Sequence, residues 1–123
     1  MKPNKILVLL TVVALLVSVS AFAEEEQEKP DYSKMKGIEL YKSLCKPCHE
    51  EDSDHGEYTP MSLIMEQWDE FYDGILEETH KGVACPKDET KKVTDVFDKD
   101  MIKKLRKFCV DHAADSEQPM TCG

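Results

Sequence analysis

The chain has 123 residues and carries 25 acidic and 16 basic side chains, which gives a formal net charge of −9. An acidic chain is a poor ligand for nucleic acid, because phosphate binding requires clustered positive charge. The length allows one domain rather than two. The negative charge favours partners that present a basic surface.

The N-terminal segment has the layout of a secretory signal peptide. Lys2 and Lys5 form a short basic region, an apolar run covers residues 6–17, and residues 21–23 read Ala-Phe-Ala, with small residues where a signal peptidase cleaves. A membrane-spanning helix needs about 20 apolar residues, so retention as an anchor is only the second interpretation. We expect residues 1–23 to be removed, leaving a mature protein with no membrane span in a bacterial periplasm or outside the cell.

The rest of the chain predicts helices and no sheet. Apolar side chains recur at helical spacing in three segments, residues 35–44, 62–78 and 98–114. Asp98 is well suited to cap the last of these helices. No stretch alternates apolar and polar residues as a half-buried strand does. The pattern therefore predicts a small all-α domain.

The segments between and around these helices lack apolar periodicity. Residues 24–34 are acidic and almost free of apolar side chains, which predicts a disordered lead-in. Residues 50–60 and 79–97 contain Gly and Pro among polar residues and predict loops or irregular structure. The domain then covers residues 35–114 and is followed by a tail, residues 115–123.

The most specific feature of the sequence is Cys45-Lys-Pro-Cys48-His49. In such a C-x-x-C-H motif, both cysteines can form thioethers with the vinyl groups of one haem, and the adjacent histidine can bind the iron from the proximal side. Small domains often need a cofactor or a cross-link to complete a core, and covalent haem c would supply that apolar bulk.

The same residues have two other interpretations. Cys45 and Cys48 could act as a thiol–disulfide oxidoreductase pair with Cys45 as the nucleophile, although that motif normally follows a strand in a βαβ unit. A zinc site would require a second pair of ligands at suitable spacing, and none is obvious in the sequence. The motif therefore favours one covalent haem held by Cys45 and Cys48 and ligated by His49.

The flanking residues make the chain resemble the class I mono-haem cytochromes c over roughly residues 35–112. In that family a Gly lies eight residues before the first haem cysteine and an aromatic residue four before it, where this chain has Gly37 and Tyr41. The resemblance implies that the first and last helices cross closely at this Gly. Leu105 and Phe108 are then the last helix's residues at the crossing.

The resemblance also implies a hydrogen bond to the haem histidine and a function. In the family, a Pro about a dozen residues after the haem histidine lends its carbonyl to the other ring nitrogen, and Pro60 stands in that place. A protein of this family is an electron carrier rather than an enzyme. We therefore expect it to exchange single electrons with redox partner proteins that have a basic docking surface.

The distal iron ligand is where the sequence departs from the family. The family offers a Met, often followed by Pro, in the loop before the last helix, but here Cys85-Pro86 stands in that place. His80 is the first candidate, because it follows the second helix and imidazole binds iron well. Met120 in the tail is the alternative ligand. An open sixth position is a third interpretation, and it would make the protein a haem-based sensor or ligand-binding module.

The chain has five cysteines, so three remain outside the motif, Cys85, Cys109 and Cys122. One disulfide and one free thiol is the simplest arrangement. Cys122 could pair with Cys85 or Cys109, or join two molecules. We favour Cys85 with Cys122, since this bond would anchor the tail and hold Met120 near the haem-facing loop.

Overall fold

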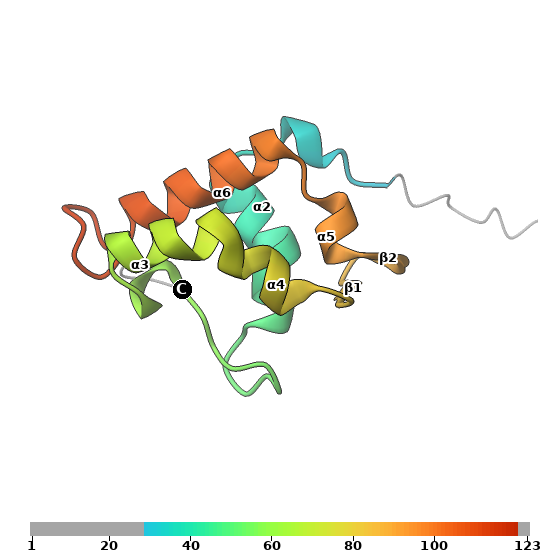
Figure 1. Cartoon of the computed structure of the whole chain (residues 1–123), viewed down its shortest axis with the longest axis horizontal. Coiled ribbons are helices and arrows are strands. Elements are labelled where there is room, and N and C mark those ends of the chain that lie inside the picture. Colours follow the sequence, from blue (N-terminus) through green and yellow to red (C-terminus); the bar gives the residue numbers. More distant parts are fainter. Residues whose placement is uncertain (1–28, 121–123) are drawn as a thin grey trace, which may run out of the picture.

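The computed structural model describes residues 29–120 (Figure 1). The expected signal peptide, residues 1–23, lies outside the described residues, as do residues 24–28 of the acidic lead-in and Cys122. The last three residues of the lead-in form a 3-10 turn, Tyr32–Lys34, in which the Asp31 carboxylate accepts the Ser33 backbone N–H. Between residues 29 and 120, no helix combines the length and the apolarity that a membrane span requires.

Helical segments make up most of the described chain, and one short hairpin interrupts them. In chain order the elements are α2 (Gly37–Leu40), a π-helical turn (Tyr41–Cys45), 3-10 turns (Lys46–Cys48 and Pro60–Ser62), α3 (Met65–Glu70), a second π-helical turn (Phe71–Ile75), α4 (Leu76–His80), β1 (Ala84–Cys85), β2 (Asp88–Lys92), α5 (Val93–Val96) and α6 (Lys99–Asp111).

The three predicted helices are confirmed, with small differences at their ends. The first comprises α2 and its π-helical turn, and the second runs through α3 and α4 with an interruption at Gly74. The third is α6, where the Asp98 side chain accepts the Met101 backbone N–H at 2.8 Å, as expected for its N-cap.

The expectation of an all-α fold is wrong at the hairpin. β1 and β2 pair antiparallel, with Ala84 opposite Lys92 and Cys85 opposite Asp88. The short helix α5 follows, so the segment expected to be a loop is largely ordered into elements. The side chains of β2 are almost all exposed and polar, so backbone hydrogen bonds rather than an apolar face define this strand. The fold is mostly helical with a small two-stranded sheet.

The helices α2 and α6 cross backbone to backbone at Gly37 (Figure 1). A Cβ atom at this position would lie 2.5 Å from the Lys104 carbonyl oxygen and 2.8 Å from the Phe108 Cβ. Only glycine permits such an approach. Leu105 is fully buried at this crossing, and the Phe108 ring centre lies 5.5 Å from that of Tyr41. The crossing that the resemblance implied is present.

The core lies between α2, α3 and α6. Its buried members come from these helices, the π-helical turn after α2, the hairpin and the segment just after α6: Leu40, Tyr41, Leu44, Trp68, Cys85, Met101, Leu105, Phe108, Cys109 and Ala113. On the surface, the Arg106 guanidinium joins α6 to the second helical segment through Asp69 and Asp73, both at 2.7 Å. The buried residues of the first helical segment, Leu40, Tyr41 and Leu44, hold the end of that segment, where the cysteine motif begins, against the core.

Candidate functional site

The cysteine motif forms one tight turn that continues the first helix. Cys45 ends the π-helical turn, and Lys46–Cys48 form a 3-10 turn. Pro47 is at the start of this turn, where the backbone N–H that proline lacks would have no partner within the helix. The His49 backbone N–H closes the turn on the Cys45 carbonyl at 3.2 Å and on the Lys46 carbonyl at 3.0 Å. Both cysteines are half-buried free thiols. The three residues of the motif therefore share one rigid piece of backbone.

The loop after the motif folds back and fixes the ring of His49. The Nδ1 atom of His49 lies 3.0 Å from the Gly56 carbonyl oxygen. A carbonyl oxygen can only accept, so Nδ1 carries the proton and the Nε2 lone pair remains available to a metal. Gly56 has a φ of 79°, in the left-handed region that glycine enters without strain.

The prediction that Pro60 lends its carbonyl to His49 is wrong, because the carbonyl beside the His49 ring is that of Gly56. The Pro60 carbonyl accepts the buried indole N–H of Trp68 at 2.8 Å. A buried indole N–H requires an acceptor, and this bond takes up the carbonyl. The Tyr58 backbone N–H donates to the His49 carbonyl, so the loop closes on the histidine before it reaches Pro60.

Two tyrosines hold the same loop against the first helix. The Tyr41 hydroxyl donates to the Tyr58 carbonyl at 2.8 Å, and the Tyr58 ring stands edge-on to the His49 ring with centres 5.2 Å apart. Burial is the main reason that the pKa of Tyr41 is raised to about 12, which keeps the hydroxyl a donor at any ordinary pH. Tyr41, the aromatic residue of the resemblance, thus supports the His49 loop.

His80 is the last residue of α4, and two oxygen atoms hold its Nδ1. The Leu76 carbonyl lies 2.9 Å from Nδ1 and the Thr79 hydroxyl 3.0 Å. Thr79 gives its own hydrogen to the Ile75 carbonyl at 2.7 Å, so towards His80 it can only accept. Both oxygens therefore require a proton on Nδ1. The lone pair of His80, like that of His49, is on Nε2.

The fold brings these two rings together. Their centres are 6.1 Å apart and their planes make an angle of 72°. Two imidazoles that bind one metal ion from opposite sides, with metal–nitrogen bonds of about 2.0 Å, have ring centres roughly 6 Å apart. His49 and His80 thus have the donor atoms, tautomers and spacing of an axial ligand pair. Together with the two adjacent thiols, they are the residues that would hold a covalent haem.

Two other side chains fit the distal position less well. His55 has its ring centre 6.5 Å from that of His49. It directly precedes Gly56, whose carbonyl holds the Nδ1 of His49, so it belongs to the loop of the proximal ligand. Met120 donates its backbone N–H to the His112 carbonyl and packs against the core just after α6. α6 has 13 residues and is about 20 Å long. α4, which ends at His80, packs on α5, which comes just before the N-terminal end of α6. Met120 lies at the C-terminal end of α6, and this is why it fits the distal position less well than His80.

Two thiols near the site, Cys45 and Cys109, have raised pKa values because of desolvation. Burial raises the pKa of the Cys45 thiol to about 12, whereas a catalytic redox cysteine needs a lowered pKa. The Cys109 sulfur lies 3.4 Å from the Tyr72 hydroxyl, and burial raises its pKa to about 11. Cys85 is also a buried free thiol, and its expected pairing with Cys122 lies outside the described residues.

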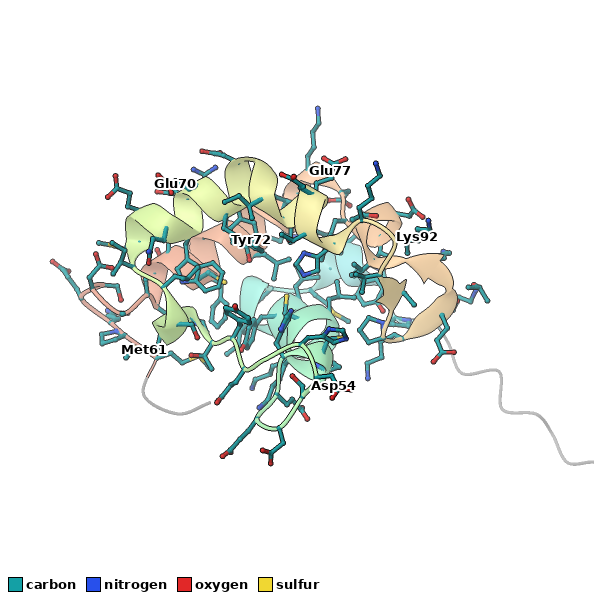
Figure 2. All side chains as sticks on the ribbon, turned by 60° about the horizontal axis from the view of Figure 1, so that its bottom comes forward. Asp54, Met61, Glu70, Tyr72, Glu77 and Lys92 are labelled. Carbon is teal, nitrogen blue, oxygen red and sulfur yellow. The ribbon has the colours of Figure 1, made fainter. Side chains whose placement is uncertain are left out.

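The loop after His49 is negatively charged. Its acidic side chains are all exposed: Glu50, Glu51, Asp52, Asp54 and Glu57. Figure 2 shows Asp54 on the projecting loop, at the opposite edge of the molecule from Glu70 and Glu77. Within residues 29–120, no three His, Cys, Asp or Glu side chains converge as a self-contained metal site would require.

No protein-family model, curated protein or solved structure matches this chain. The functional interpretation therefore depends on the residues themselves. Sequence reasoning named Cys45, Cys48, His49 and His80 as candidate site residues. It missed the Gly56 and Leu76 carbonyls, because a backbone group leaves no mark in the sequence. Thr79 carries a weak signal, since it directly precedes the candidate ligand.

Proposed function

We propose that the protein is an exported mono-haem c-type cytochrome that carries single electrons between redox partners and is not an enzyme. The observation that supports this most directly is the pairing of His49 and His80, with ring centres 6.1 Å apart and both Nδ1 atoms held by carbonyl oxygens. Cys45 and Cys48 would hold the haem covalently, His49 would be the proximal ligand and His80 the distal ligand.

The chain's residues are suited to electron transfer rather than to binding a gas or a substrate. Bound haem would supply one reversible electron at its iron. His49 and His80 are held in place by hydrogen bonds, so both axial positions can stay filled in either oxidation state. A filled sixth position favours the carrier over the haem-based sensor. The raised pKa of the Cys45 thiol argues against the thiol oxidoreductase.

The export and docking parts of the proposal rest on sequence and charge. Residues 1–23 would direct the chain to a bacterial periplasm or beyond. The acidic loop beside His49 would face a partner with a basic surface. Charge complementarity of this kind raises the association rate more than the affinity.

The proposal is tested by expressing the full chain in a bacterial host that exports it and has haem-attachment machinery. We expect a sharp reduced α-band in the visible spectrum and haem that stays with the polypeptide after denaturation. Replacing Cys45 and Cys48 by Ala should abolish covalent attachment, whereas replacing Cys109 by Ala should leave it intact. A wild-type protein without a Soret band would overturn the proposal.

A further inference from the structure

The Thr79 hydroxyl contacts both a carbonyl of its own helix and the ring of His80. In helices, Ser and Thr often donate to the carbonyl four residues earlier, and Thr79 does so with Ile75 at 2.7 Å. That bond uses the only hydrogen of the hydroxyl. It leaves an oxygen lone pair 3.0 Å from the Nδ1 of His80.

One N–H of His80 therefore has two acceptors. The Leu76 carbonyl at 2.9 Å and the Thr79 hydroxyl at 3.0 Å lie at almost equal distances from Nδ1. With a single acceptor, the ring can pivot about the hydrogen bond, and a second acceptor limits that rotation. The Phe71 ring stands edge-on to His80, with centres 6.2 Å apart and planes at 79°, and restricts the ring from another side.

The restricted ring is crossed with respect to its partner. The planes of His49 and His80 make an angle of 72°, close to perpendicular. Hydrogen bonds to the outer nitrogen of a metal-bound histidine fix its orientation and tune the metal. Crossed imidazoles leave the iron d orbitals of ferric haem nearly degenerate and give a strongly anisotropic low-spin electron paramagnetic resonance (EPR) signal. Parallel imidazoles give a rhombic signal.

We propose that Thr79 is a positioning residue that, together with the Leu76 carbonyl, holds the distal His80 crossed to His49. This inference rests on the proposed haem function and adds to it a residue that orients the distal ligand through a hydrogen bond. The Thr79 hydroxyl contacts the outer ring nitrogen of His80, the proposed distal ligand. It acts only through the ring of His80.

The test is the EPR spectrum of the ferric, haem-loaded full chain and of three variants. Thr79→Val keeps the shape and removes the hydroxyl, and Thr79→Ser keeps the hydroxyl. Thr90→Val is the matched control, because Thr90 is also exposed and its hydroxyl bonds Asp88 in the hairpin, away from His80. We expect the strongly anisotropic signal in the wild type, in Thr79→Ser and in Thr90→Val. In Thr79→Val the signal should become more rhombic, or split into two populations.

Each other result has a distinct meaning. A rhombic wild-type signal would overturn the crossed geometry. An anisotropic signal that is unchanged in Thr79→Val, or equally changed in Thr90→Val, would overturn the role of Thr79 while leaving the cytochrome proposal intact. A chain that takes up no haem would overturn the proposed function, and this inference with it. Equal unfolding temperatures of the variants would show that a spectral change does not come from misfolding.

Discussion

At the scale of single residues, the distal ligand is the feature most open to direct test. Replacing His80 by Ala should open the sixth position of the haem, because it removes the imidazole that we propose as the distal ligand. We expect the reduced variant to bind carbon monoxide readily and the reduced wild type to bind it poorly, as measured by difference spectra. The matched control is His55→Ala, whose ring centre is also within 6.5 Å of His49. If His55→Ala opens the site and His80→Ala does not, the distal assignment is wrong.

Cys109 predicts a pH dependence of stability. Burial raises its pKa to about 11 in the folded chain, whereas an unfolded thiol titrates near about 8.5. The folded state therefore retains a proton that the unfolded state loses. The stabilisation is fully present below about pH 8.5 and is lost progressively as the pH rises through the folded value, by roughly 3 kcal/mol in all.

Urea unfolding at neutral pH and at about pH 10 checks this expectation. Cys109→Ala removes the thiol, so its free energy of unfolding should fall less over this range than that of the wild type. Cys109 of the folded wild type should also resist alkylation at neutral pH, because the thiolate is the reactive form. An identical pH dependence in both proteins would rule out this contribution.

At the scale of elements, the crossing of α2 and α6 limits what the fold tolerates. Gly37→Ala would place a Cβ 2.5 Å from the Lys104 carbonyl oxygen, so the helices must separate. We expect a loss of at least about 1–3 kcal/mol in the free energy of unfolding, the usual cost of overpacking. Gly74→Ala is the control, because a Cβ there has no atom within 4 Å. Its effect should stay within about 1 kcal/mol. Equal losses in both variants would contradict the steric explanation.

The elements also show how far the sequence predicts this fold. The helical segments follow from apolar periodicity, and the capping role of Asp98 follows from residue type and position. The hairpin escaped prediction because β2 reads Asp-Glu-Thr-Lys-Lys and pairs through its backbone alone. Periodicity detects segments whose side chains alternate between core and solvent, and the side chains of this strand do not alternate.

The same limit applies to the site. The spacing of Cys45, Cys48 and His49 is local, so the sequence displays it completely. The approach of His80 to His49 depends on how α4 packs, and the sequence offered His80 only as a candidate. The oxygen that orients His49 belongs to Gly56 rather than Pro60, whose carbonyl instead accepts the indole N–H of Trp68. Which carbonyl lies beside which donor is a property of the fold.

At the scale of the whole molecule, charge is unevenly placed around the site. The acidic side chains of the loop after His49 are exposed and follow the proposed haem ligand directly in the sequence. Interactions between exposed charges are largely screened beyond about 8 Å at physiological ionic strength, so these loop charges should matter more than distant ones. Removing them should slow electron exchange with a cationic partner, even though many acids remain elsewhere.

The experiment compares two triple variants that change the net charge equally. One replaces Glu50 and Glu51 by Gln and Asp54 by Asn, and the other replaces Glu66, Glu70 and Glu117 by Gln. Electron exchange with a small cationic metal complex, followed by stopped flow at low salt, should slow markedly in the loop variant and little in the distant one. Added salt should slow the wild type more than the loop variant, because it screens the attraction that the loop variant has already lost. Equal slowing in both triple variants would mean that net charge alone steers the encounter, and that the loop does not mark the edge at which electrons leave the protein.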